Sequence, residues 1–389
     1  MERNYSEKTC LCALNRLLGF EPQAAHRLLE ATGSALALFN LSPDAKLGLL
    51  GPFSKIAPML DVRELERTRE ELARMEDSGC SFITMYDPGY PALLRECADA
   101  PLGLYYRGTS PPEKVFNARP QIAVVGTRDV SMYGKEWCRK IVGALGASKD
   151  KPLVVSGLAL GTDITAHIAA LEAGLPTVAV LPTGIDDIYP SRHRRFAGIL
   201  TATEGCALVT DYPPGTEPKA INFIRRNRII AGMCSGTILV ESKAKGGGMI
   251  TARLAASYDR DLLVLPGRVD DLRSQGCNTL LREKLAEPVT DTVHFLDVLG
   301  LGRPQRRSTA GFEEQIKDRY GGSLDQEEMA DLLAVASAIR RRRGITPEEI
   351  CPEACLPYSR VIRLVGLLES DGFISMDLLQ RCAINVKFV

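Results

Sequence analysis

The chain has 389 residues, 45% of them hydrophobic and 25% charged, a composition typical of a soluble globular protein large enough for two or three domains. Its 48 lysines and arginines balance 48 aspartates and glutamates, so any attraction for nucleic acid has to come from local clusters of positive charge. The eleven cysteines lack metal-ligand spacing, and no apolar stretch reaches the roughly 20 residues of a membrane-spanning helix. We therefore expect reduced thiols, no metal, no membrane contact and a cytoplasmic location.

The first 75 residues are expected to form a small helical module, because leucines recur every three or four positions and Gly19 and Gly33 interrupt the pattern. A central domain is expected over residues 76–300. It opens with a strand at 82–86, a proline-rich turn and an apolar segment at 103–108.

From residue 121 onward, short apolar strands alternate with amphipathic helices. Strands are expected at 121–126, 152–156, 176–181, 207–210, 236–241 and 261–265, and helices at about 131–147, 162–173, 191–204, 219–232 and 250–258. This alternation predicts an α/β fold with a Rossmann-like, doubly wound and mostly parallel sheet, covered by helices on both faces.

The C-terminal part of the chain is expected to contain a linker over 301–324 and a second small module over 325–389. In this module, two short helical patterns are divided near Pro357 and end at Gly372, before a β-like run. A helix-turn-helix followed by strands has the outline of a winged-helix-like domain.

Three of the expected strands end in glycine-rich turns. The segments are GTR at 126–128, SGLALGTD at 156–163 and ESKAKGGG at 241–248. Turns after parallel strands meet at one edge of the sheet, and backbone amides at helix N-termini attract negative charge. Positive side chains accompany them at Arg128, Arg226, Arg228 and Lys245. Together they predict a site for a ligand with more than one phosphate.

Common nucleotide cofactors do not fit these turns. A dinucleotide site would have G-x-G-x-x-G in its first turn and an acidic residue at the end of the second strand, whereas this chain has GTRDVSMYG and Ser156. A Walker A loop is absent from the sequence as well. We therefore expect no cofactor.

The order of the motifs resembles the DNA-processing protein A family, also called Smf. The resemblance covers about residues 80–295, through GTRDVSMYG, SGLALGTDITAH, PTGIDDIYPSRH, INFIRRNRIIAG, GGGMITA and LPGR. It implies a Rossmann-like protein that binds single-stranded DNA, forms a homodimer and loads RecA recombinase during DNA uptake and recombination, without being an enzyme. The N-terminal helices resemble the helix-hairpin-helix or SAM-like module of that family, and the C-terminal segment its winged-helix domain.

The resemblance also implies which residues bind the strand. They are Gly126, Thr127, Arg128, Ser156, Gly157, Gly161, Phe223, Arg226, Asn227, Arg228 and Gly247, and we add Lys245 for its charge. Amides and arginines would hold phosphates, and Phe223 would stack on a base without reading sequence. Many relatives have Phe-Pro before the Arg-Asn-Arg motif, whereas here Ile224 follows Phe223.

Simpler structural roles compete with several of these assignments. Phe223 can be a core residue, and either Arg226 or Arg228 can pair with an acid such as Glu241. Asp163 is expected to cap a helix or oppose its dipole, and His167 to be a structural hydrogen-bonding residue. His193, beside three arginines, is expected on a solvated basic face.

The alternative function is a Rossmann-like nucleoside-monophosphate phosphoribohydrolase. That group needs a Pro-Gly-Gly-x-Gly-Thr turn followed by a catalytic glutamate, and the stretch KGGGMITARLA lacks both the proline and the carboxylate. Because hydrolysis needs a positioned acid or base, the sequence favours strand binding over this enzyme.

Overall fold

The structure is a computed structural model that describes residues 5–302, 310–342, 344–377 and 380–384, without the side chains of 310–312. The chain divides into two compact units, Met1–Pro304 and Gln305–Val389. Each unit has its own hydrophobic core, so we describe them separately.

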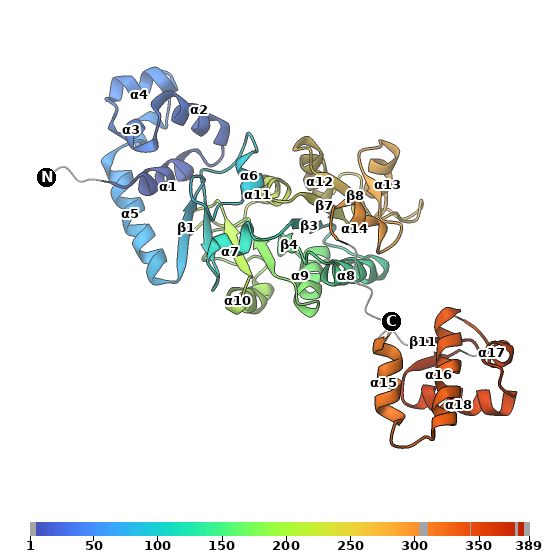
Figure 1. Ribbon diagram of the computed structural model, residues 1–389. Coiled ribbons are helices and arrows are strands. Elements are labelled where there is room, and N and C mark those ends of the chain that lie inside the picture. Colours follow the sequence, from blue (N-terminus) through green and yellow to red (C-terminus); the bar gives the residue numbers. More distant parts are fainter. Residues whose placement is uncertain (1–4, 303–309, 343, 378–379, 385–389) are drawn as a thin grey trace. The chain divides into compact units, whose positions relative to one another are not determined.

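The N-terminal part of the first unit is a group of short helices, blue in Figure 1. They are α1 (Glu7–Leu18), α2 (Pro22–Thr32), α3 (Ala35–Asn40), α4 (Pro43–Leu50), a 3₁₀ turn (Ala57–Met59) and α5 (Val62–Asp77). Serine side chains at 6, 34 and 42 cap α1, α3 and α4 by accepting from backbone N–H groups three residues on. Apolar side chains at helical spacing, such as Leu11 and Leu14, form the core of this group.

The rest of the first unit is built on a nine-stranded sheet with the order β1-β2-β6-β5-β4-β3-β7-β8-β9. The pairs β1–β2 and β2–β6 are antiparallel and all other pairs are parallel. The strands are β1 (Cys80–Thr84), β2 (Gly103–Arg107), β3 (Gln121–Val125), β4 (Leu153–Ser156), β5 (Thr177–Val180), β6 (Ala207–Thr210), β7 (Gly236–Leu239), β8 (Asp261–Val264) and β9 (Glu287–Pro288).

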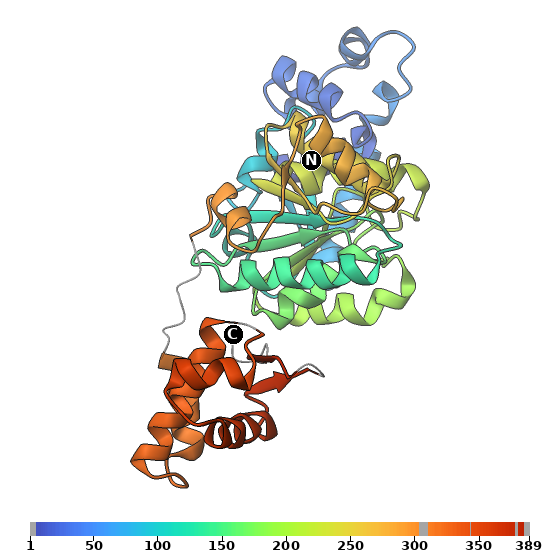
Figure 2. The same cartoon turned by 90° about the vertical axis from the view of Figure 1, so that its right-hand side faces the viewer.

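Helices cover both faces of this sheet (Figure 2). They are α6 (Ala92–Arg95), α7 (Pro112–Phe116), α8 (Met132–Ala147), α9 (Thr162–Glu172), α10 (Arg194–Ala202), α11 (Ala220–Met233), α12 (Gly247–Ser257), α13 (Gln275–Arg282) and α14 (His294–Val298). Successive side chains of a strand point to opposite faces. Accordingly, Ile122 and Val124 of β3 pack with α8 and α9, whereas Ala123 and Val125 pack with α11 and α12.

The strand order reverses at β3. The chain proceeds from β3 to β4, β5 and β6 on one side, and α11 then leads back to β7 on the other side of β3. In open parallel sheets, ligands bind at such a reversal, beyond the carboxyl ends of the strands. The expected α/β class with a large, mostly parallel sheet is therefore confirmed, and the reversal lies between β3 and β7.

The second unit contains α15 (Ala310–Tyr320), α16 (Gln326–Arg341), α17 (Pro347–Ala354) and α18 (Tyr358–Ser370), followed by the antiparallel strands β10 (Ile374–Met376) and β11 (Cys382–Ile384). Ile316 and Tyr320 of α15 are buried in the same core as α16 and α18. The expectation of a linker over 301–324 was therefore wrong for 310–320, which form α15 of this unit; residues 303–309 lie outside the described part.

Candidate functional site

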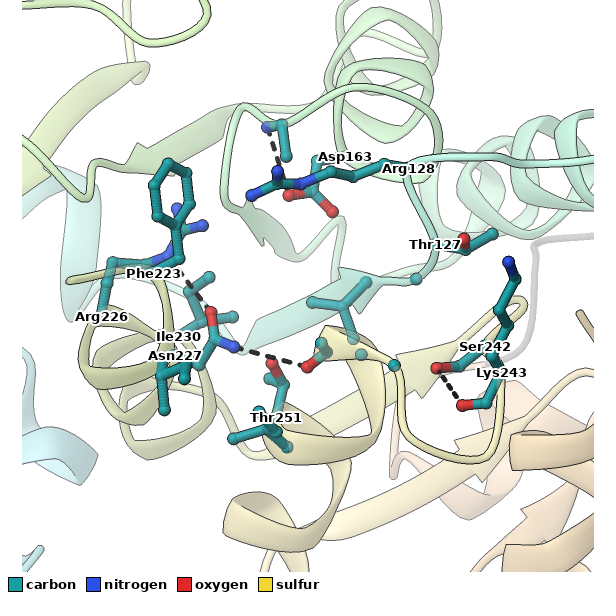
Figure 3. A pocket seen from close by; sticks show the side chains of 18 of the residues that line it. Thr127, Arg128, Asp163, Phe223, Arg226, Asn227, Ile230, Ser242, Lys243 and Thr251 are labelled. Atoms are coloured by element: carbon teal, nitrogen blue, oxygen red, sulfur yellow. Dashed lines mark hydrogen bonds between the residues drawn. The ribbon is translucent and has the colours of Figure 1, made fainter. Parts of the chain in front are cut away.

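A cavity of about 390 Å³ lies at the reversal between β3 and β7. We call it the central pocket. The turns after β3 and β7 and parts of α9, α11 and α12 line it (Figure 3). It brings together seven of the twelve predicted site residues, namely Gly126, Thr127, Arg128, Phe223, Arg226, Asn227 and Gly247.

The turn after β3 is held by its neighbours on both sides. The Thr127 N–H donates to the carbonyl of Glu241 (2.7 Å), and the Thr127 carbonyl accepts from the Thr162 N–H (3.1 Å). Gly126 fits because a Cβ at this position would collide with Thr162 Oγ1 and the Glu241 carbonyl. The glycine therefore permits close packing of β3, β7 and α9 at the floor of the pocket.

Glu241 has a structural role that the sequence did not suggest. Its carboxylate accepts from the Ser131 N–H (2.8 Å) and Ser131 Oγ (2.5 Å), just before α8. Glu241 is therefore not the acid that pairs with one of the two arginines; Arg228 pairs with Asp211 instead. The Glu241 carboxylate links the end of β7 to the start of α8.

Arg128 and Phe223 point toward one another across the pocket (Figure 3). The guanidinium carbon of Arg128 lies 4.7 Å from the centre of the Phe223 ring, and Tyr189 meets the same ring edge-on at 5.3 Å. Phe223 is only partly buried, so it is not a core residue. A positive charge and an aromatic surface thus stand side by side at the pocket, the combination that unpaired polynucleotides bind.

Arg226 lies at the bottom of the pocket and is 4% exposed. Its Nη1 donates to the carbonyls of Gly157 (2.7 Å) and Val180, at the ends of β4 and β5. A Cβ on Gly157 would collide with this guanidinium, which explains the glycine. Burial lowers the pKa of Arg226 to about 10, against the opposing attraction of Asp163, so the side chain stays positive at neutral pH.

Asp163 is the acidic side chain opposite Arg226. It is 7% exposed, lies in the first turn of α9 and accepts from the Ala159 N–H (3.3 Å) in the preceding loop. No side chain of the described residues caps α9, so the expected capping role was wrong, whereas the place of Asp163 in the first turn agrees with the expected dipole partner. Burial raises the pKa of this carboxyl, although Arg226 and Arg128 oppose the shift. The attraction between Asp163 and Arg226 thus opposes the effect of burial on both groups.

The N-terminus of α12 forms another wall. Asn227 reaches it through Nδ2, which lies 3.5 Å from the Gly247 carbonyl. The amides of Gly247 and Gly248 have no hydrogen-bond partner among the described residues, and no side chain caps the helix. Free amides at a helix N-terminus favour an anion, so this wall is suited to a phosphate.

The exposed charges at the pocket are predominantly positive. Arg128 and Lys243 form no ion pair within the described residues, while the carboxylate of Asp129 is neutralised by Arg273 at 3.1 Å. Lys243 lies in the same loop as Lys245 but lines the pocket, which Lys245 does not. Lys243 was not among the predicted site residues. The only sequence feature that indicates it is its position in the glycine-rich turn SKAKGGG.

The remaining predicted residues lie outside the pocket. Ser156 is fully buried and donates to the Val124 carbonyl (2.7 Å), which joins two strands. Gly161 has φ +77° at the start of α9, a conformation that glycine adopts readily. Lys245 is exposed on the loop after β7. These positions support or flank the pocket without lining it.

The prediction that Arg228 is part of the site has to be corrected, because this residue lies on the other side of α11 from the pocket. Its Nη2 lies 2.6 Å from a carboxylate oxygen of Asp211, and Nη1 donates to the Asp99 carbonyl. Both side chains of the ion pair are buried. Arg228 therefore anchors α11 to the end of β6 and is not available to a ligand in the central pocket.

Two histidines near the pocket are structural. His167 is fully buried, with Nδ1 2.7 Å from Thr177 Oγ1, in line with its expected role. His193 was expected on a solvated basic face, and this was wrong: it is 9% exposed and donates from Nδ1 to the Leu158 carbonyl (2.8 Å).

The fold and the pocket define a Rossmann-like protein whose site at the strand reversal is suited to phosphates and to a stacked ring. A model of the family described as DNA recombination-mediator protein A matches residues 81–300. The chain belongs to this family.

Two curated relatives illustrate the similarity. The chain is 36% identical over 277 residues to protein Smf of Synechocystis, covering 70% of this chain and 66% of that protein. It is 38% identical over 201 residues to DNA processing protein DprA of Streptococcus pneumoniae, covering 52% of this chain and 68% of that protein. The chain thus spans about two thirds of the length of these relatives.

Solved structures give the same result. The X-ray structure of DNA processing protein A from Streptococcus pneumoniae aligns with a TM-score of 0.64 at 30% identity, over 77% of this chain and 98% of that one. DNA processing protein A from Helicobacter pylori, whose structure was described for its single-stranded DNA binding mode, aligns with a TM-score of 0.50 at 28% identity, over 56% of this chain and 95% of that one.

Proposed function

We propose that this chain binds single-stranded DNA in the central pocket, protects it and loads RecA recombinase onto it, as in natural transformation. The observation that carries the proposal is the pairing of Arg128 with the partly exposed ring of Phe223 beside the free amides of α12. Arginine and amides can hold successive phosphates, while the ring accepts any base, so the site is suited to a strand of any sequence.

The charge distribution favours an extended polyanion over a single small ligand. Arg128 and Lys243 are exposed on turns that follow different strands. A strand that crosses the pocket would meet these groups in succession. Release of counterions from its phosphates makes such binding strongly dependent on salt.

A titration of the full chain with single-stranded and double-stranded oligonucleotides of mixed sequence, at two ionic strengths, tests the proposal. We expect tighter binding of the single strand and a steep loss of affinity with salt. Equal affinity for both forms, or release of free base from nucleoside monophosphates, would contradict it, the latter in favour of the hydrolase.

The finer parts of the proposal need their own measurements. A homodimer would appear in sedimentation at working concentration, and RecA loading as faster RecA assembly on a single strand when this protein is present. The α17–α18 pair followed by β10 and β11 supports a winged-helix-like second unit. In α18, Arg360 and Arg363 pair with Asp331 and Glu328, which favours a protein contact over duplex DNA.

We also propose that the protein works in the cytoplasm, where RecA acts. All eleven cysteines are free, nine of them buried, as is usual in a reducing compartment. Among the described helices, none has the length and apolar character needed to cross a membrane.

A further inference from the structure

A second cavity, of about 400 Å³, lies where the turn between α1 and α2 meets α11. Phe20, Arg27 and Arg225 are among the residues that line it. Phe20 is 52% exposed, although it is a large apolar side chain in contact with the main domain. We call this cavity the Phe20 cavity.

Phe20 is held in place by contacts that span the sequence. The guanidinium carbon of Arg225 lies 4.1 Å from the centre of the Phe20 ring, and Arg225 Nη1 donates to the Phe20 carbonyl (3.1 Å). Tyr212 supports the ring from the side, with ring centres 6.0 Å apart. An aromatic ring and a planar guanidinium are thus stacked and partly open to solvent. Bases of unpaired nucleic acid stack on both kinds of surface.

The Phe20 cavity and the central pocket lie on opposite faces of α11. Phe223, Arg226 and Asn227 line the central pocket, whereas Arg225 and Arg228 line the Phe20 cavity. At 3.6 residues per turn these two sets point in opposite directions. Ile224, which lines the central pocket, is 45% exposed, and Ile221, on the same face of α11 as Arg225 and Arg228, is 47% exposed. Each of the two faces therefore carries an exposed apolar side chain.

The helix is narrow enough for one strand to reach both places. An α-helix with side chains is about 10–12 Å across, and a nucleotide rises about 3.4 Å in a duplex strand. About three nucleotides would therefore span α11, and fewer if the strand is extended. The exposed start of α11, with Lys219 at its N-cap and no capping side chain, lies along this route.

The charge of the Phe20 cavity is nearly balanced. Arg27 and Arg225 line it together with Glu21 and Asp99, and Arg228 is neutralised by Asp211. The Asp99 carboxylate also accepts from the Tyr258 hydroxyl (2.8 Å). Such a cavity has little net attraction for a phosphate, so stacking is its main means of binding.

We propose that the Phe20 cavity holds a nucleobase of the same unpaired strand that occupies the central pocket, stacked on Phe20 and Arg225. This rests on the proposed function and extends it: the strand crosses α11 and engages the N-terminal helices. The binding site then comprises two stacking positions, at Phe223 and at Phe20, separated by one helix.

The test compares variants of the full chain on oligothymidylates from two to about twenty nucleotides, of which the shortest cannot span α11 and the longest exceeds the known site sizes of single-strand binders. Phe20→Ala and Phe20→Leu are expected to bind the shortest strand like wild type and the longer strands about five-fold or more weakly. The dependence on salt should not change, because no charge is removed.

Matched control variants distinguish the loss of stacking on Phe20 from a folding defect of the N-terminal helices. Phe20→Tyr keeps the ring and should bind like wild type, while Phe53→Ala removes a 95% exposed ring elsewhere on the N-terminal helices and should have no effect. Phe20→Leu keeps apolar contact with Tyr212, so it guards against a folding defect.

Wild-type affinity of Phe20→Ala and Phe20→Leu at every length would overturn the proposal, and so would an equal loss on short and long strands. If wild type binds single strands and Arg128→Ala weakens that binding, while the Phe20 variants do not, only the second position fails. If wild type shows no preference for single strands, the proposed function itself fails.

Discussion

Arg128 and Phe223 form a cation–π pair, with the guanidinium carbon 4.7 Å from the ring centre. The two residues come from different segments, the turn after β3 and the first turn of α11. The charge and the stacking surface of the pocket are therefore parts of one contact. A ligand that uses one of them changes the environment of the other.

Replacing Arg128 with Ala is expected to weaken the binding of all single-stranded sequences to a similar extent. It should also reduce the slope of log affinity against log salt by about one unit, because one phosphate contact is lost. Arg119→Ala is the matched control, since Arg119 is exposed and precedes β3, at the opposite end of that strand. An unchanged slope would remove Arg128 from the site.

Replacing Phe223 with Ala should lower affinity by about 1–3 kcal/mol and leave the salt slope unchanged, because stacking carries no charge. The double variant with Arg128→Ala should lose less than the sum of the single losses, since the two side chains contact each other. Fluorescence anisotropy with one labelled oligonucleotide measures the affinities of the two single variants and of the double variant. Strict additivity would show that the pair does not act together.

The two glycines Gly161 and Gly247 are expected to respond differently to alanine. Gly161 has φ +77°, and a Cβ there would meet the carbonyls of Thr127 and Arg128, so Gly161→Ala should destabilise the fold by about 1–3 kcal/mol and displace the turn after β3. An added Cβ on Gly247 meets no atom within 4 Å, so Gly247→Ala should fold like wild type. Urea unfolding of both variants checks the contrast, and equal stabilities would contradict it.

Arg228→Ala should affect stability and leave the central pocket intact. Removing one partner of the buried Arg228–Asp211 pair leaves an uncompensated carboxylate and should cost about 3–5 kcal/mol. Adding Asp211→Asn should recover part of this loss. The folded variant should still bind a strand short enough to occupy only the central pocket; failure to do so at full folding would place Arg228 in that site.

His167 is expected to make the stability of the fold sensitive to mild acid. Burial, with smaller effects of Arg226 and His193, lowers the pKa of His167 from 6.5 to about 3, so the imidazole is neutral in the folded chain. Below about pH 6.5 the unfolded chain takes up a proton that the folded chain does not, and stability falls as pH decreases toward 3.

Between pH 6 and pH 5, the contribution of His167 to the slope of the free energy of unfolding against pH approaches about 1.4 kcal/mol per pH unit. His167→Asn, which keeps a polar group near the position of Nδ1 for Thr177, should show a shallower decline of the free energy of unfolding over this range. Parallel declines for variant and wild type would contradict the neutral state of His167. The comparison uses slopes, so a general loss of stability in the variant does not affect it.

The sequence predicted the sheet well because alternating strands and helices leave a local pattern. The strand at 207–210 was placed at its observed bounds, and the helix expected at 219–232 is α11 at 220–233. The convergence of the turns after β3 and β7 on one cavity followed as well, since the carboxyl ends of parallel strands share one edge. These features depend on neighbours along the chain and on one general rule of topology.

The directions of individual arginines could not be predicted in the same way. Arg226 and Arg228 belong to one motif, yet one faces the pocket and the other faces Asp211, because their partners come from distant strand ends. Arg225 contacts Phe20, which lies 205 positions earlier in the chain. The spacing of two residues does predict that Arg226 and Arg228 lie on different sides of the helix, but the partner of each side chain becomes known only when the helix is packed.

The hydrogen bonds of Thr127 with Glu241 and Thr162, together with the bonds from Ser131 to the Glu241 carboxylate, fix the floor of the central pocket before any ligand arrives. A strand that enters therefore orders little of the protein, and most of the entropy lost on binding belongs to the nucleic acid. The association rate should then be limited by diffusional encounter and electrostatic steering and not by rearrangement of the protein. Differences in affinity among ligands should therefore appear mainly in their dissociation rates.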